Sequence, residues 1–88
     1  MNIQKLDEFS VLKVIAGEPT EVNSYLIRLR LLDKGMELSV GGVNSIVDRL
    51  FKNGLIDLVE FEAIVGYTGI LVTCKGRYVV DAGLQRYL

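Results

Sequence analysis

The stretch SVGGVNSIVDRLFKNGLI (residues 39–56) carries both a start and a stop signal for one helix, so it constrains the fold more than any other segment. Ser39 is a favourable N-cap residue. Gly54 stands where a left-handed residue commonly ends a helix. Between these signals, one apolar face with Phe51 at its edge is formed by Val43, Ile46, Val47 and Leu50. The pattern predicts an amphipathic helix over residues 40–53.

The polar side of this predicted helix begins with two adjacent glycines. At 100° per residue, the face opposite the apolar one holds Gly41, Ser45, Asp48 and Lys52, flanked by Gly42, Asn44 and Arg49. A glycine inside a helix costs about 1 kcal/mol relative to alanine, and less near an end. Two explanations stay open: the glycines let a neighbouring segment pack closely, or they leave a bare helix start that can approach a phosphate.

Two further helices are predicted before residue 39. The first covers residues 4–16, is polar at Lys5, Glu8 and Lys13, and has an apolar face of Leu6, Phe9, Leu12 and Ile15. Gly17 and Pro19 end it. The second runs from Thr20 or Glu21 to Gly35, with Thr20 as its N-cap. Its predicted core stripe consists of Val22, Tyr25, Leu26, Leu29 and Leu32.

A second apolar strip is predicted on the opposite side of that helix. Ile27 and Leu31 are four residues apart and point away from the stripe. Either a terminal segment of the same chain covers them, or they form a subunit interface. We assign Ile27 and Leu31 to a homodimer interface as an expectation to be tested.

After the central helix, the pattern indicates a hairpin and a last helix. Residues 55–66 and 70–74 are predicted to be strands, joined by a turn at residues 66–69. Residues 73–88 are predicted to form a helix capped by Thr73, with Tyr78, Val79 and Ala82 on its apolar side. Five basic residues outside the central helix are candidates for phosphate contacts: Arg28, Arg30, Lys34, Lys75 and Arg77.

Composition narrows the functional classes. The 88 residues are expected to form a single domain, 1–88, and their formal net charge of −1 requires any nucleic-acid interface to gather its positive charge on one face. No histidine is present and Cys74 is the one cysteine, expected to be a small buried side chain. The chain therefore predicts no intrachain disulfide, while a bridge between two chains through Cys74 stays open, and it predicts no metal site, no cofactor and no catalytic triad. It shows neither a signal peptide nor a membrane span, so a cytoplasmic location is expected.

Two motifs resemble a known group of proteins. The segment MELSVGGVNSIVDRLFKNGLIDLV is similar to the recognition-helix region of PadR-like and MarR-like transcriptional regulators, through Ser39, the glycine pair, Leu50 and the Gly54-Leu55-Ile56 exit. LVTCKGRYVV resembles the segment that starts the helix after their wing, at Leu71, Thr73, Lys75, Gly76 and Arg77. The resemblance spans about residues 6–85 and implies an α+β, mostly helical winged helix-turn-helix: three helices, a two-stranded wing hairpin and a C-terminal helix.

The resemblance implies a homodimeric, sequence-specific regulator of transcription that binds double-stranded DNA. Its third helix would enter the major groove, where Asn44, Ser45 and Arg49 are the base-reading candidates and Arg49→Ala would weaken binding. The other implied DNA contacts are Ser39, Gly41, Gly42, Lys52, Tyr67 and Thr68. The departures are an uncharged wing, Asp48 on the reading face, and little chain after the last helix for a dimerisation region. The alternative is a winged helix that serves as a protein-interaction module in a larger transcription or replication assembly.

Overall fold

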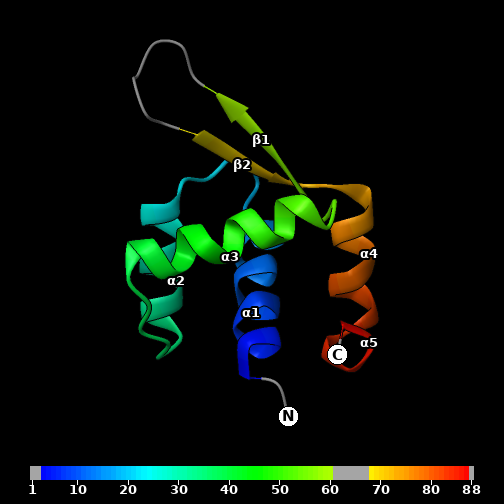
Figure 1. Ribbon diagram of the computed structural model, residues 1–88, viewed down its shortest axis with the longest axis horizontal. Coiled ribbons are helices and arrows are strands. Elements are labelled where there is room, and N and C mark those ends of the chain that lie inside the picture. Colours follow the sequence, from blue (N-terminus) through cyan, green and yellow to red (C-terminus); the bar gives the residue numbers. More distant parts are fainter. Residues whose placement is uncertain (1–2, 61–67, 88) are drawn as a thin grey trace.

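The computed structural model describes residues 3–60 and 68–87, and within these it has the predicted winged helix-turn-helix architecture (Figure 1). In chain order the elements are α1 (Ile3–Gly17), α2 (Ser24–Asp33), α3 (Val40–Lys52), β1 (Ile56–Glu60), β2 (Thr68–Val72), α4 (Cys74–Ala82) and α5 (Leu84–Tyr87). The predicted fold class is confirmed among the described residues: helices and one two-stranded antiparallel hairpin.

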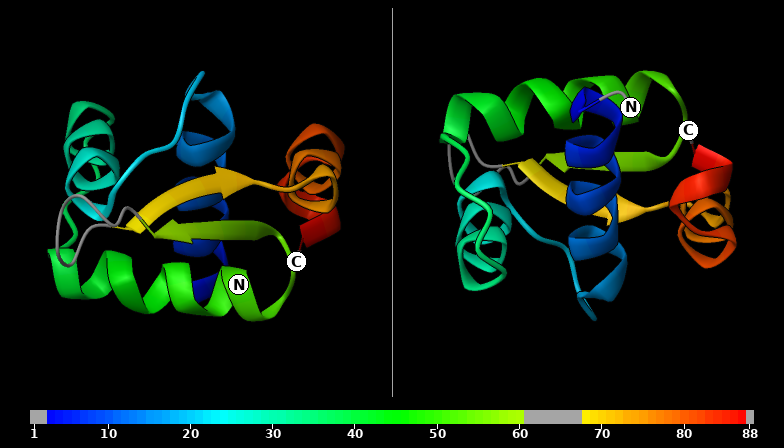
Figure 2. Two further views of the ribbon diagram at one scale, coloured as in Figure 1. Left: turned by 90° about the horizontal axis from the view of Figure 1, so that it is seen from above. Right: turned by 90° about the horizontal axis from the view of Figure 1, so that it is seen from below.

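Helix α1 is the centre of the domain. It is surrounded by α2, α3, α4 and the hairpin, as the view from below in Figure 2 makes clear. Its buried side chains therefore extend beyond the predicted stripe to include Val11 and Val14, because neighbours cover it on several sides. Glu8, predicted to stay at the polar surface, is only 3% exposed.

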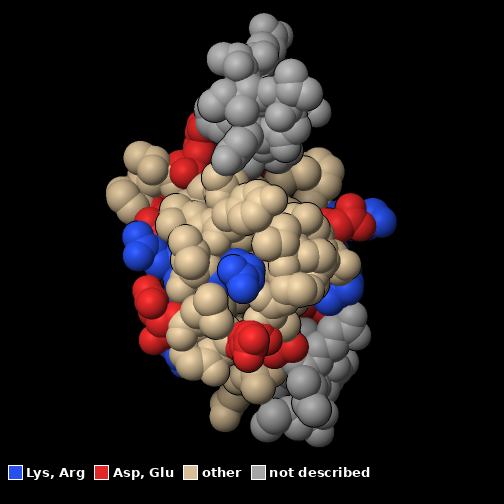
Figure 3. Space-filling view, turned by 90° about the vertical axis from the view of Figure 1, so that its left-hand side faces the viewer, with Lys and Arg blue, Asp and Glu red and all other residues tan. Residues whose placement is uncertain are grey.

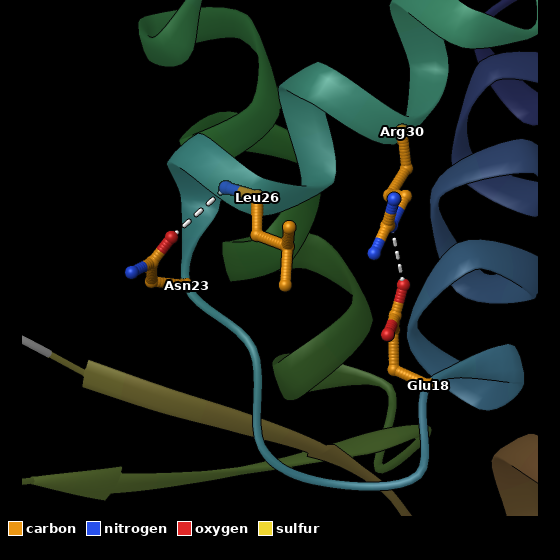
Figure 4. Close-up of polar contacts among 4 residues, drawn as sticks. All are labelled: Glu18, Asn23, Leu26 and Arg30. Carbon is orange, nitrogen blue, oxygen red and sulfur yellow. Dashed lines mark hydrogen bonds and ion pairs between the residues drawn. The ribbon is translucent and has the colours of Figure 1, made fainter.

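Helix α2 begins later than predicted. Its N-cap is Asn23, not Thr20: the Asn23 side chain accepts a hydrogen bond from the Leu26 N–H at 2.9 Å (Figure 4). Val22 lies outside the helix and forms an isolated antiparallel bridge with Ile70, with N–H donors bonded in both directions at 3.1 and 2.7 Å. Val22 is extended and not helical because its backbone pairs with Ile70 of β2.

The predicted core stripe of the second helix is confirmed at Val22 and Leu26, which lie in or against the core, and is wrong at its other positions. Ile27 and Leu31 are fully buried in the core, so their assignment to a dimer interface is wrong. Tyr25, Leu29 and Leu32, predicted to be core, are exposed. The physical reason is that α1 and α3 pack on the Ile27–Leu31 side of the helix. Two apolar strips on one helix do not reveal which of them the neighbouring helices will cover.

Helix α3 agrees with its prediction at both ends and on its inner face. The Ser39 hydroxyl accepts from the Gly42 N–H at 3.0 Å, and Val43, Ile46, Val47 and Leu50 are buried. The helix ends at Lys52, and Gly54 takes a left-handed backbone conformation with φ +75°. Ser39 and Gly54 therefore set the limits of α3, as the local signals predict.

The bounds of the second strand differ from the predicted ones. Ile56 pairs with Val72 and Glu60 with Thr68, so Thr68 and Gly69 belong to β2 and not to a turn at 66–69. Phe61, Ala63 and Tyr67 lie outside the described residues. The register is determined at the opposite end of the hairpin, where the Thr73 N–H donates to the Leu55 carbonyl at 3.1 Å and ties the two strands to α3 and α4.

The start of α4 packs against the end of α3. The Thr73 hydroxyl accepts from the Gly76 N–H at 3.0 Å, which confirms Thr73 as the N-cap, and donates to the Gly54 carbonyl at 2.8 Å. The Lys75 ammonium donates to the Asn53 carbonyl at 3.0 Å. A Cβ atom at Gly76 would lie 2.0 Å from the Leu55 carbonyl oxygen, so only glycine fits at this close approach.

The last predicted helix is divided in two. Gly83, at φ +93°, ends α4 after Ala82, and α5 follows as a separate short helix. Of the predicted apolar side, Val79 packs on the core together with Val80, whereas Tyr78 is 72% exposed and Ala82 is exposed. Cys74, the first residue of α4, is also exposed, so its expected burial is wrong. No helix among the described residues is long and apolar enough to cross a membrane.

Candidate nucleic-acid interface

The outer face of α3 is the candidate site. Helix α3 lies across one side of the molecule, with α1 behind it and the hairpin above (Figure 1). Its exposed residues opposite the core are Gly41, Ser45, Asp48 and Lys52, as the 100° spacing predicts. The fold therefore brings four of the predicted site residues together on one surface. Ser39 is exposed at the start of this face.

The two glycines of α3 have no packing partner among the described residues. A Cβ atom added at Gly41 would meet only the Ser39 hydroxyl oxygen, at 3.9 Å. At Gly42 the same oxygen would lie at 3.3 Å. From the preceding turn only the Ser39 hydroxyl approaches these positions, closely at Gly42 and loosely at Gly41, and no atom of α2 is among the near ones. Packing of α2 therefore does not account for the glycines. What remains is a helix start with a bare backbone, next to a Ser45 hydroxyl that donates to the Gly41 carbonyl at 3.1 Å.

Asn44 is held at one flank of α3 by the first residue of α2. The Ser24 hydroxyl donates a short hydrogen bond to the Asn44 side-chain carbonyl. This contact joins the two helices of the helix-turn-helix at the site itself and orients the Asn44 amide, because its carbonyl group is directed to α2. The amide nitrogen carries two N–H donors for an acceptor outside the protein.

Arg49 lies on the other flank and is bound to α1. Its Nε donates to Glu8 Oε2 at 3.1 Å, and the Glu8 side chain is only 5% exposed. The second carboxylate oxygen of Glu8 accepts from the Tyr87 hydroxyl at 2.7 Å. Sequence reasoning missed Glu8 and Tyr87. The available signal was the position of Glu8 four residues before Leu12, which places the two side chains on the same, buried face of α1.

Tyr87 has a strongly perturbed acidity. Burial raises the pKa of its phenol well above the ordinary value, and the hydrogen bond to Glu8 and the negative charge of that carboxylate raise it further. The positive charge of Arg49 lowers the same pKa by a smaller amount. The phenol therefore stays protonated and is the donor in the contact with Glu8.

This acidity predicts a loss of stability at high pH. In the unfolded chain Tyr87 ionises near pH 10, its ordinary pKa, whereas in the folded state it keeps its proton. The stabilisation from this group is therefore complete below pH 10 and is lost as the pH rises above it, by at most about 1.4 kcal/mol per pH unit and less where solvent screens the group. Urea unfolding across this pH range should show the decline in the parent protein and in Tyr78→Phe. An equally steep decline in Tyr87→Phe would contradict the assignment.

Charge on the candidate face is nearly balanced. Lys52 pairs with Asp48 at 3.0 Å on the surface of α3, as its spacing predicts. Of the other basic candidates, Arg30 pairs with Glu18 at 2.8 Å (Figure 4), Lys75 binds the end of α3, and Arg77 donates to the Ala16 carbonyl at 3.4 Å. The end of the molecule where α2 and the start of α3 lie is mostly uncharged at its centre, with one basic group there, an acidic group directly below it and charges of both signs along its edges (Figure 3).

Of the two predicted wing contacts, only Thr68 lies among the described residues. Thr68 is the first residue of β2, where its backbone pairs with Glu60. Tyr67, the other predicted wing contact, lies outside the described residues. In Figure 1 the hairpin leaves the end of α3 and runs back above the helix toward its start, which is where a wing must lie to contact DNA beside the recognition helix.

Helix α2, the turn after it, α3 and the hairpin together define a winged helix-turn-helix domain. No protein-family model matches the chain, and no curated protein sequence matches it significantly. Among solved structures, its fold is similar to that of PadR-like and MarR-like winged-helix transcription regulators, some of them in DNA complexes.

Three of these structures illustrate the similarity. A PadR-like transcription factor from Bacteroides fragilis has a TM-score of 0.75 at 16% identity, over 91% of this chain and 78% of its own. FabT from Streptococcus pneumoniae, in complex with DNA, has a TM-score of 0.73 at 21% identity over 93% and 52%. PcaV from Streptomyces coelicolor, a transcriptional regulator bound to its natural ligand, has a TM-score of 0.71 at 20% identity, over 92% of this chain and 55% of its own. The present chain thus spans about half the length of FabT.

Proposed function

We propose that this chain is a sequence-specific DNA-binding transcriptional regulator whose α3 enters the major groove. The observation that carries the proposal is the bare first turn of α3, where Gly41 faces open space on the exposed side of a helix-turn-helix. In such folds the start of the second helix meets the bases and the phosphates beside them. Backbone N–H groups and the positive end of the helix dipole can approach a phosphate at a turn without side chains.

Individual residues on α3 follow from this orientation. Asn44 and Ser45 are the base-contacting candidates, and Asn44 offers its amide donors because its carbonyl oxygen is bound by Ser24. Ser39 and Gly42 form the capped start of the helix, where backbone groups lie closest to a phosphate. Lys52, in the last turn, exchanges its surface pair with Asp48 for a phosphate, at little cost because exposed ion pairs are weak. Tyr67 and Thr68 are proposed to contact the DNA backbone from the wing.

The proposal includes two copies of the chain on one operator. Helix-turn-helix dimers place their recognition helices one turn of DNA apart and so double the number of bases that are read. Sedimentation of the free protein and of its complex with DNA measures the stoichiometry directly. One copy per operator at saturation would rule out the dimer without affecting the role of α3.

The first experiment is an amide NMR titration with random duplex DNA at low salt. Shifts should concentrate in the amides of residues 39–45 and of the wing, and they should fade as salt is added because phosphate contacts release counterions. Thr73 and the α4 residues after it, beyond the hairpin, provide an internal control that should not respond. An undisturbed α3 throughout the titration would contradict the proposed orientation.

A second candidate function is a protein-interaction module. The specific observation is the exposed apolar strip of Tyr25, Leu29 and Leu32 on α2. Helix α2 lies at the end of the molecule whose centre is mostly uncharged (Figure 3). Contiguous exposed apolar patches often mark contacts between proteins. This function predicts that Leu29→Ser abolishes binding to the protein partner, while DNA leaves the amides of α3 unchanged. A DNA response confined to α3 and the wing favours the regulator instead.

A further inference from the structure

One buried charge connects three helices of this domain. Among the described residues, Glu8 is the only charged side chain that is buried. Its two carboxylate oxygens contact different elements: Oε1 accepts from Tyr87 of α5 at 2.7 Å, and Oε2 accepts from Arg49 of α3 at 3.1 Å. A buried carboxylate is stable only with hydrogen-bond donors, so loss of the Tyr87 contact would affect the Arg49 contact of the same group, and the reverse.

Tyr87 is firmly held against α1. Its ring packs on Phe9, with ring centroids 5.8 Å apart, and the Lys5 ammonium lies 4.8 Å from the ring centroid. Helix α5 packs on α1 and α4, on the opposite side of α1 from α2 (Figure 2). The side-chain bridge through Glu8 therefore connects α5 to the flank of the helix proposed to read DNA.

We propose that Glu8 is a positioning residue that couples the docking of α5 to the orientation of α3 on DNA. With both donors bound, the carboxylate holds the Arg49 guanidinium at a defined place beside α1. When Tyr87 is displaced, Glu8 Oε1 loses its donor and attracts the Arg49 guanidinium. The α3 backbone at Arg49 then moves with that side chain. A ligand or segment that displaces α5 would thereby change DNA affinity from a distance. This inference rests on the proposed function only for its effect on DNA.

It also assigns Arg49 a role different from base reading. A residue whose Nε is bound to a buried carboxylate of another helix acts through the position of its own helix. Arg49→Ala would then weaken DNA binding although no contact to a phosphate or a base is removed.

The test compares Tyr87→Phe with Tyr78→Phe. Both variants remove one phenol hydroxyl, but Tyr78 is largely exposed on α4. In the absence of DNA, Tyr87→Phe should shift the amide resonances of Arg49 and its neighbours in α3, whereas Tyr78→Phe should leave them in place. If Tyr87 served only to anchor α5, the shifts would be confined to α1, α4 and α5, and this result would overturn the coupling.

DNA affinity is the second readout. Tyr87→Phe should weaken binding to duplex DNA about five-fold, a typical size for coupling between sites. The dependence of affinity on salt should not change, because no phosphate contact is lost, whereas Lys52→Ala should reduce that slope by about one ion. Glu8→Gln, which keeps the side-chain shape, should repeat the α3 shifts. Failure of the parent protein to bind DNA would refute the proposed function, while the amide shifts would still decide the coupling.

Discussion

Gly76→Ala is expected to destabilise the fold by about 3 kcal/mol, because Gly76 has the closest surroundings of the glycines described. The added Cβ would lie 2.0 Å from the Leu55 carbonyl oxygen and 2.9 Å from a Val72 methyl carbon. Carbonyl oxygen and helix backbone are both fixed here, so α4 must move away from the end of α3. That movement would weaken the bonds from Thr73 to Gly54 and from Lys75 to Asn53.

The measurement is urea or thermal unfolding followed by circular dichroism. Gly17→Ala is a matched control, because a Cβ at Gly17 meets no atom within 4 Å of the described structure and its backbone is helical. This control should be neutral or slightly stabilising, as alanine is the better helix former. Equal stability of the two variants would show that α4 does not approach Leu55 as closely as described.

The parts of the fold that could be predicted are those determined by neighbouring residues. Ser39 and Thr73 cap α3 and α4 through hydroxyl groups that bond to an N–H three residues later. Gly54 takes the left-handed conformation that ends α3, with φ +75°. Such signals span only a few positions of the chain, so the sequence contains them completely.

The errors arise where distant residues compete with a local signal. Thr20 and Asn23 are both acceptable caps, and Asn23 is used because Val22 bridges to Ile70 in the wing. The residues at 66–69 suggested a turn. The strand pairing, which continues as far as the bond between Thr73 and Leu55, instead places Thr68 and Gly69 in β2. In both cases the deciding contact joins segments far apart in sequence, and no local pattern reports it.

The sequence predicts which residues of α3 are exposed at the candidate site, but not which side chains of other helices bind them. Helical spacing correctly placed Gly41, Ser45, Asp48 and Lys52 on the outside of α3. The same spacing put Arg49 on a flank, but it could not show that Glu8 binds it. Residue type and angle define which face a side chain occupies, whereas its partner depends on how α1 packs across α3.

Gly41→Glu is expected to weaken DNA binding by about 2–3 kcal/mol, or roughly 30- to 150-fold, without harming the fold. The new carboxylate would stand on the exposed first turn of α3, where the described structure places only the Ser39 hydroxyl nearby. A glutamate there suits the positive end of the helix dipole, so stability should rise slightly. Against DNA, the same charge would face phosphates at close range and fill the space that the bare backbone leaves for them.

Gly17→Glu separates this local effect from net charge. It adds the same charge at the exposed end of α1, on the side of the molecule away from α3 (Figure 2). Titration of both variants with duplex DNA at one low salt concentration should show a large loss for Gly41→Glu and a small one for Gly17→Glu. Equal losses would mean that only overall charge matters and that the start of α3 does not contact DNA. A protein partner bound through α2 would be insensitive to both changes, so this pair of variants also distinguishes the two candidate functions.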